Sequence, residues 1–178
     1  IVSTAMMLFM ALIIAVPIGV FSAIYLTEYS KANGKLIYLI RIFTDSLSGI
    51  PSIVFGLFGM LIFLDLFGIG RNILAGSLTL VLIILPSIIR QTEETLISIP
   101  ASLREGSLAL GASKVRTIFK IVLPCGFSGI ITAIILSVGR IVGESAALIY
   151  TSGAVRYMPS GYFSAGSSFA VMMWMFSS

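Results

Sequence analysis

Residues 105–111 read Glu-Gly-Ser-Leu-Ala-Leu-Gly, and residues 121–124 read Ile-Val-Leu-Pro. Together they give the pattern E-G-S-x3-G-x9-I-x-L-P, which lies in a hydrophilic, net-basic segment between two long apolar runs, residues 90–124. The polar and apolar positions predict two short helices with a bend at Gly111, where the missing side chain would let a partner surface or a second helix approach closely. The charge pattern alone also fits an ordinary amphipathic loop at a membrane interface.

The composition is that of an integral membrane protein. Hydrophobic residues make up 58% and charged residues only 10% of the 178 residues, whereas soluble domains have roughly 45–50% apolar and about 25% charged residues. The net charge of +4 could attract an anionic partner, but basic residues in a multi-pass protein are typical of cytoplasmic loops, so we expect no nucleic acid as a partner. The chain starts at Ile1 with an apolar run and no basic n-region, and we expect it to be part of a longer protein.

The sequence carries little that could support catalysis. It has no histidine, a single cysteine at Cys125, and carboxylates that are dispersed along the chain. A metal site needs clustered ligands of these types, and a nucleotide site of the P-loop kind needs a glycine-rich phosphate loop, which the sequence lacks. We therefore expect no catalytic residues, no metal and no cofactor in this chain.

Four apolar segments have about the length that a helix needs to cross a bilayer, roughly 20 residues: residues 2–26, 50–67, 73–89 and 126–150. A tight turn at residues 65–72 predicts that the second and third segments form an antiparallel hairpin. Ser48 and Pro51 are typical of a helix start, with a serine cap and a proline in the first turn. Residues 169–176 are too short to span. The expected fold class is all-α, a polytopic membrane helical bundle with four full spans.

Positive charge predicts the orientation of these spans. With four alternating spans, the segments on one side carry eight basic residues, and those on the other side carry two, Arg71 and Arg156. The basic-rich side is expected to be cytoplasmic by the positive-inside rule, and its basic residues are Lys31, Lys35, Arg41, Arg90, Arg104, Lys114, Arg116 and Lys120. On the same side, Asp45 is expected to be solvated, and Glu93 and Glu94 are expected to face solvent or a partner protein.

One face of the fourth predicted span is small and charged. At 100° per residue its members lie within about 80° of one another on a helix, and they are Gly129, Ala133, Ser137, Arg140, Glu144, Ala147 and Thr151. Small residues let helices pack closely, and charged residues within a membrane usually face a bundle interior or a wet cavity. Arg140 and Glu144 could equally form a structural ion pair, or Arg140 could extend to the outer interface.

The spacing in residues 105–124 resembles the coupling loop of ABC-importer permeases, in which the pattern is usually E-A-A-x3-G-x9-I-x-L-P. Gly106 and Ser107 replace the two alanines; both are small, so close packing should survive with some loss of helix propensity. Residues 48–59, which read S-G-I-P-S-I-V-F-G-L-F-G, resemble the start of a span in phosphate-importer permeases. Residues 139–153 are similar to the G-R-x-x-G-E-T-A-P-L-L-x-T-A-G region of PstA-type permeases, although Ala147 stands where these have proline.

This resemblance implies a single permease domain over residues 1–178, with a MetI-like core and incomplete at both ends, in which residues 90–124 form a cytoplasmic coupling loop. It implies a PstA-type permease of an ATP-driven phosphate importer in the prokaryotic plasma (inner) membrane. The partners it implies are a cytoplasmic ATP-binding subunit that holds the ATP, a sister PstC-type permease, an extracytoplasmic phosphate-binding protein and the lipid bilayer. The residues expected to couple to the ATP-binding subunit are Glu105, Gly106, Ser107, Gly111, Ile121, Leu123 and Pro124.

The resemblance also assigns a substrate pathway to the charged face of the fourth span. Arg140 would offer positive charge and directed donors to a passing oxyanion. Glu144 would orient Arg140 and offset its charge, and Ser137 and Thr151 would line the same path. Alternatives are a permease for another oxyanion such as molybdate or sulfate, a membrane enzyme, and a polytopic scaffold without a transport role.

Overall fold

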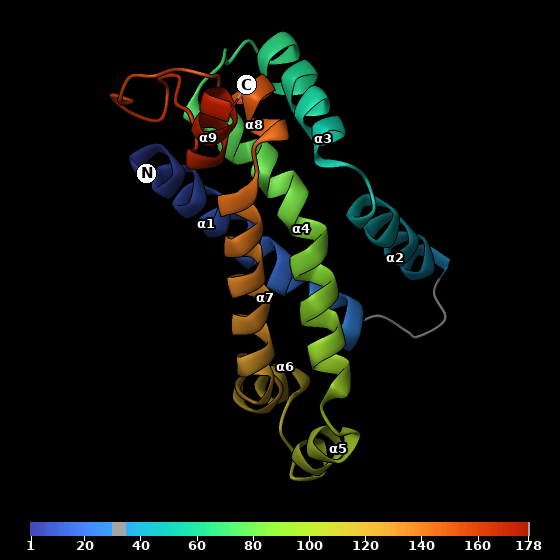
Figure 1. Cartoon of the computed structure of the whole chain (residues 1–178). Helices are drawn as coiled ribbons and strands as arrows, with labels where there is room; N and C mark the ends of the chain where they lie inside the picture. The colour runs from blue at the N-terminus through green and yellow to red at the C-terminus, as the bar shows by residue number, and fades with distance from the viewer. Residues whose placement is uncertain (30–34, 178) are drawn as a thin grey trace.

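The computed structural model describes residues 1–29 and 35–177, and within them the regular structure is helical, with no strand. Long helices run through the molecule as α1 (Val2–Ile24), α4 (Ile73–Ser98) and α7 (Leu123–Gly143). Two shorter helices at the lower end in Figure 1 are α5 (Ala101–Ala109) and α6 (Lys114–Thr117). Those at the upper end are α3 (Ser52–Gly59), α8 (Ala146–Thr151) and α9 (Phe169–Ser177). The predicted all-α class is confirmed, while the basic residue Lys31 lies outside the described residues.

The long helices account for most of the membrane-crossing length. Within the described part of the chain, three stretches are long and apolar enough to cross a membrane: Val2–Tyr29, Ile73–Ser98 and Lys114–Gly143. The first adds a π-helical segment, η1 (Tyr25–Tyr29), to α1, and the third joins α6, a π-helical segment η3 (Ile118–Val122) and α7. At their lower ends these helices are longer than the predicted apolar runs. A helix can continue into polar residues as long as some of its side chains pack against neighbouring segments.

The predicted span at residues 50–67 is one arm of a bent pair. Helix α2 (Lys35–Ser48) and the continuous stretch of α3 and η2 (Met60–Leu66) meet at 102°, so the number of spans is three, or four if the bent pair is counted as one. The prediction that Ser48 caps the second arm is wrong, because Ser48 ends α2 and its hydroxyl donates to the Asp45 carbonyl at 2.7 Å. Pro51 precedes α3 at φ −57° and ψ 137°, and a proline disfavours helical geometry in the residue before it, which separates the two arms.

Helix α4 lies at the centre of the bundle and packs against α1, α2, α3, α7 and α8. Its inward side chains join those of α1 in the main core, whose fully buried members include Met7, Ala11, Ala15, Ile73, Leu80, Ile83, Ile84 and Ile88. A Cβ at Gly19 would lie 2.6 Å from Ile88 Cγ2, so the close approach of α1 to α4 depends on a small residue at this position.

The upper end of the molecule is built differently from the prediction. The fourth span was expected to continue to residue 150, but α7 ends at Gly143, Glu144 is extended at φ −76° and ψ 121°, and α8 begins a separate short helix. Helix α8 packs against α3, where a Cβ at Gly56 would lie 2.6 Å from Ala147 Cα. The predicted hairpin is present, since α3 and η2 ascend to a turn at residues 67–72 and α4 descends from it (Figure 1).

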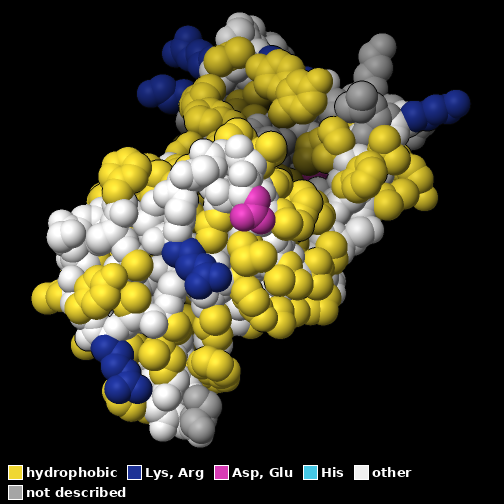
Figure 2. Space-filling view, turned by 90° about the horizontal axis from the view of Figure 1, so that it is seen from above, with side chains coloured by type: hydrophobic (Ala, Val, Ile, Leu, Met, Phe, Trp, Pro, Cys, Tyr) yellow, Lys and Arg dark blue, Asp and Glu magenta, His cyan; other side chains and the backbone are white. Residues whose placement is uncertain are grey.

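Large apolar side chains remain exposed around the bundle, among them Phe9, Ile13, Phe21, Phe127, Ile135 and Leu136 on α1 and α7. From above, hydrophobic side chains cover most of the visible face, and the charged ones appear as separate spots (Figure 2). Contiguous apolar surface of this kind is typical of contact with lipid or with another membrane subunit, which agrees with the helix lengths.

Candidate coupling loop and charged sites

The loop between α4 and α7 turns sharply at Gly111. Gly111 has φ +82°, which is left-handed backbone that glycine adopts without steric cost. After it, the Ser113 hydroxyl accepts from the Arg116 N–H at 3.4 Å and caps α6. The predicted bend at Gly111 is therefore confirmed.

The arms of the loop differ from the two short helices that were predicted. Residues 90–98 continue α4, and the first separate helix is α5. The second arm is the start of the long stretch Lys114–Gly143, so Pro124 does not close the loop as expected. Pro124 lies just after η3, in which the Leu123 N–H donates to the Ile118 carbonyl. Proline has no N–H to donate, and the wider π-helical turn before it accommodates its ring.

A groove of about 520 Å³ lies between α5 and the start of the second arm. Four predicted coupling residues line it, namely Gly106, Ser107, Gly111 and Ile121, together with Ser102, Leu103, Leu110, Ala112 and Arg116. Glu105 is exposed beside the groove, and Leu110 is 91% exposed at the tip of the loop. Leu123 instead packs on the lower apolar cluster, and Pro124 is exposed, so neither residue lines the groove.

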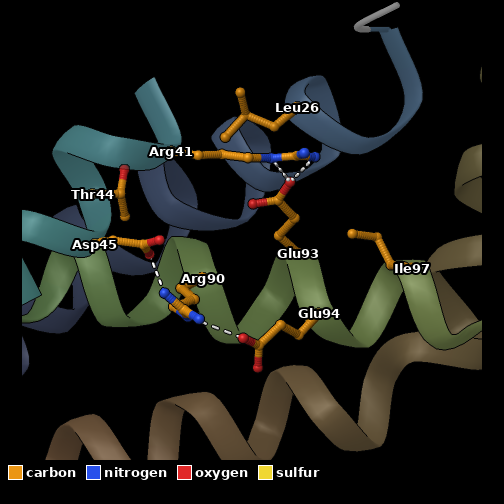
Figure 3. A pocket seen from close by; sticks show the side chains of 8 residues that line it. All are labelled: Leu26, Arg41, Thr44, Asp45, Arg90, Glu93, Glu94 and Ile97. Carbon is orange, nitrogen blue, oxygen red and sulfur yellow. Dashed lines mark hydrogen bonds and ion pairs between the residues drawn. The ribbon is translucent and has the colours of Figure 1, made fainter. Parts of the chain in front are cut away.

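A cluster of charges joins α2 to α4 (Figure 3). The Arg41 Nε donates to the Glu93 carboxylate at 2.8 Å, and Arg90 pairs with both Asp45 and Glu94 around a cavity of about 160 Å³. Glu93 is only 8% exposed, so the prediction that it faces solvent or a partner is wrong. Asp45 and Glu94 are exposed, as expected, but each is ion-paired. Because a carboxylate as buried as Glu93 needs a partner, the Arg41–Glu93 pair fixes α2 to α4.

Arg140 and Glu144 do not pair with each other. The Arg140 Nη1 donates to the Ser87 hydroxyl of α4 at 3.0 Å, and the Glu144 Oε1 accepts from the Ala147 N–H at 3.2 Å at the start of α8. The prediction that Glu144 orients Arg140 is therefore wrong. Its physical reason is the end of α7 at Gly143, which takes Glu144 off the helical face that the 100° spacing assumed.

The other two predicted pathway residues are enclosed. Ser137 is 4% exposed and Thr151 is 0% exposed, and their hydroxyls donate to the Ala133 and Ala147 carbonyls within their own helices. Arg140 is half-buried. Of the four predicted residues, Arg140 therefore has the most open position and a cationic group to offer.

Sequence reasoning missed Ser87, the α4 residue that accepts a hydrogen bond from Arg140, and the polar residue Gln91 one turn further along α4. Ser87 and Gln91 line a polar cavity of about 200 Å³ with Ser48, Arg90 and Glu94. Ser87 and Gln91 are four residues apart and so lie on one side of α4, and two polar residues at this interval in an apolar helix were the available signal. Within the described residues, no group of three or more His, Cys, Asp or Glu side chains could hold a metal ion.

The long apolar helices and the grooved loop at one end define a polytopic helical membrane protein with an exposed loop. The family described as "binding-protein-dependent transport system inner membrane component" matches residues 3–177, and the chain belongs to this family. It is therefore a multi-pass protein of the prokaryotic plasma (inner) membrane, in a family of transport permeases.

Three individual proteins show which permeases this chain is similar to. The chain is 42% identical over 146 residues to the probable ABC transporter permease protein YqgI of Bacillus subtilis (strain 168), covering 82% of this chain and 49% of that protein. It is 40% identical over 146 residues to the phosphate transport system permease protein PstA of Mycobacterium leprae, covering 82% and 47%. It is 33% identical over 175 residues to PstA of Xylella fastidiosa, covering 98% and 61%. The chain spans about half the length of the first two relatives.

The fold is also similar to a solved structure. A chain of the MetNI methionine ABC transporter in an inward-facing conformation superposes with a TM-score of 0.68 at 26% sequence identity, over 82% of this chain and 68% of that one. This confirms the predicted MetI-like core.

Proposed function

We propose that the chain is the permease subunit of an ATP-driven phosphate importer, forming one half of the translocation pathway. The grooved loop at Gly111 carries the proposal, because it presents an exposed surface at the end of two long helices without a filling element from the described chain. Phosphate as the substrate is supported by the relatives that are phosphate transport system permeases of the PstA type, at 33–40% identity.

The loop groove is proposed as the contact for a separate cytoplasmic ATP-binding subunit. Glu105 is exposed, and the neighbouring Gly106 and the turn residue Gly111 contribute no side chain at their places in the groove lining. ATP would bind to that subunit, and the permease itself would need no cofactor. Since α5 is joined directly to α4 and the second arm continues into α7, a push on the groove would move both long helices as rigid bodies.

Arg140 is proposed as the group that attracts the anion. Its guanidinium is held by Ser87 at 3.0 Å, and a planar fork with five N–H donors has several left for phosphate oxygens. Ser137, Glu144 and Thr151 would shape the path by holding the ends of α7 and α8 in place, since their own hydrogen bonds are internal. A sister permease of the PstC type would supply the other half of the path, and an extracytoplasmic binding protein would deliver phosphate.

Transport by the reconstituted complex tests this function. The full-length permease, its sister, the ATP-binding subunit and the binding protein would be placed in proteoliposomes, and ATP-dependent uptake of labelled phosphate measured with and without excess molybdate or sulfate. We expect phosphate uptake that neither anion suppresses. Uptake of molybdate or sulfate in place of phosphate would assign another oxyanion, and ATP hydrolysis with no anion transport would rule out the importer.

A further inference from the structure

One arginine at the lower end of the molecule makes three hydrogen bonds to two other segments. The Arg104 Nε of α5 donates to the Glu28 Oε1 of η1 at 2.8 Å. Its Nη1 donates to the Ile99 carbonyl at 2.8 Å, and its Nη2 donates to the Leu96 carbonyl at 2.7 Å. The three nitrogens of one guanidinium therefore join α5, which we call the coupling helix, to the end of the first span and the end of α4.

Both carbonyls belong to the end of α4. Ile99 is the residue that follows its last turn, with extended backbone at φ −71° and ψ 127°, and the last carbonyls of a helix have no partner within it. A cation at a helix C-terminus is also favoured by the helix dipole. Arg104 thus closes α4 with the helix that follows it in the chain, and a lysine could not reproduce this because it lacks the planar fork.

The ion pair to η1 is shielded from water. The side chain of Arg104 is 19% exposed and that of Glu28 is 9% exposed, in contrast to the half-exposed pairs of Arg90. Exposed pairs contribute little because solvent screens them, whereas the loss of one partner of an enclosed pair leaves an uncompensated charge. Glu28 and Arg104 are 76 residues apart, so this contact is a long-range tie.

The contacts around Arg104 make the junction stiff. Ile24, Leu96, Ile99, Ile118 and Val122 form an apolar cluster where the first span, α4 and the second arm meet. One turn further along α5, the buried Ser107 hydroxyl lies 2.8 Å from the Thr117 hydroxyl of α6. Arg104 and Ser107 are three residues apart and share the inner face of α5, while Glu105 and Gly106 between them are exposed.

We propose that Arg104 is a positioning residue through which a displacement of the coupling helix reaches the first span and α4. Arg104 is not among the residues that line the groove, and it acts by keeping α5, η1 and the end of α4 in one rigid unit. The inference rests on the proposed function in one respect, namely that a partner ATPase moves α5. Without Arg104, α5 would still present its outer face to that partner, but its movement would no longer be passed on in full.

The test uses the assembled full-length complex in proteoliposomes, with Arg104→Gln, Arg104→Lys and Glu28→Gln, and with Arg71→Gln as the matched control. Arg71 is exposed just before α4 begins, whereas Arg104 follows the other end of that helix. The readouts are copurification of the ATPase subunit, the stimulation of ATP hydrolysis by phosphate-loaded binding protein, and the phosphate transported per ATP hydrolysed. Coupling between distant sites is typically worth a factor of about 5–150.

We expect Arg104→Gln to copurify with the ATPase but to lose stimulation by about fivefold or more, with fewer phosphates moved per ATP, and Arg71→Gln to match the wild type. Arg104→Lys should be intermediate, and Glu28→Gln combined with Arg104→Gln should be no worse than Arg104→Gln alone, because the two act through one contact. Wild-type stimulation in Arg104→Gln would overturn the proposal.

A second variant decides the case in which Arg104→Gln fails to assemble. Glu28→Gln removes the ion pair to η1, through which Arg104 contacts the first span, and leaves both carbonyl contacts to α4 in place. Normal stimulation in an assembled Glu28→Gln complex would therefore overturn the proposed transmission to the first span. These outcomes differ from a failure of the proposed function itself, in which the wild-type complex would show no phosphate uptake at all.

Discussion

The hydroxyl oxygens of Ser107 and Thr117 lie 2.8 Å apart, and both side chains are buried. They stand on opposite sides of the Gly111 turn, so a single hydrogen bond closes the loop across its width. The Thr117 hydroxyl also donates to the Ser113 carbonyl at 3.2 Å, which ties the cap of α6 into the same contact. The closed loop can receive a force on its groove as one body.

Removing this hydrogen bond should loosen the loop. We expect Ser107→Ala to lower the free energy of unfolding by about 1 kcal/mol, the usual net contribution of one hydrogen bond. A lower midpoint of thermal unfolding in detergent would show this loss. The double variant Ser107→Ala with Thr117→Val should cost less than the sum of the two single changes, because no buried hydroxyl is then left without its partner. Ser102→Ala, at an exposed serine on the same helix, is the control, and equal midpoints for Ser102→Ala and Ser107→Ala would contradict the expectation.

The two glycines of the loop between α4 and α7, Gly106 and Gly111, should respond in opposite ways to alanine. Gly111→Ala places a side chain on left-handed backbone at φ +82°, which costs roughly 1–2 kcal/mol, and should weaken binding of the ATPase subunit in a copurification titration. Gly106 lies within α5 with open space where a Cβ would stand, so Gly106→Ala should stabilise the helix by about 0.5–1 kcal/mol. The idea fails if Gly111→Ala is as stable as Gly106→Ala.

Loss of the Arg140 guanidinium should reduce transport without reducing the amount of complex. A hydrogen bond to a charged group is worth about 1.5–3 kcal/mol, and about 1.4 kcal/mol corresponds to a factor of ten, so Arg140→Ala should lower initial phosphate uptake by about tenfold or more. Arg140→Lys should retain part of the uptake, and Ser87→Ala should show a smaller loss because it removes only the partner at 3.0 Å. Arg71→Ala controls for charge, and full uptake by Arg140→Ala in normally assembled complex would remove Arg140 from the pathway.

Alanine substitutions at two glycines of α7 distinguish the effect of helix packing on stability from the effect of helix propensity. A Cβ at Gly129 would lie 2.3 Å from the Thr95 hydroxyl oxygen of α4, whereas nothing lies within 4 Å of a Cβ at Gly139. Gly129→Ala should therefore destabilise the protein by about 1–3 kcal/mol through overpacking. Gly139→Ala should leave the stability unchanged or raise it by about 0.5–1 kcal/mol. Thermal unfolding of both variants in the same detergent measures the difference, and an equal shift in both would show that α4 and α7 do not pack as described.

The sequence predicts best where one local property decides the structure. The predicted bend lies at Gly111, whose backbone at φ +82° favours glycine, and the apolar runs at residues 2–26 and 73–89 form the cores of two long helices. Hydropathy predicts that these spans exist but not where they end. Helix α4, for example, continues through the polar residues 90–98.

The remaining errors come from contacts between distant segments. The end of α7 at Gly143 separates Glu144 from Arg140, and a face drawn at 100° per residue assumes a helix that does not end there. Arg140 donates a hydrogen bond to Ser87, 53 residues away in the sequence. Glu93 accepts a hydrogen bond from Arg41, 52 residues away. Such pairs depend on which helices lie side by side, and single-sequence periodicity contains no information on that.

The bend between α2 and α3 has a consequence for the surrounding lipid. The arm beyond the bend, Ser52–Leu66, combines the 8 residues of α3 with the 7 residues of η2. At about 1.5 Å per residue it is roughly 22 Å long, which is about 8 Å shorter than a typical hydrocarbon core of about 30 Å. An arm of this length crosses the bilayer by itself only where the bilayer beside α3 is thinner, or where a neighbouring subunit covers the ends of the short arm.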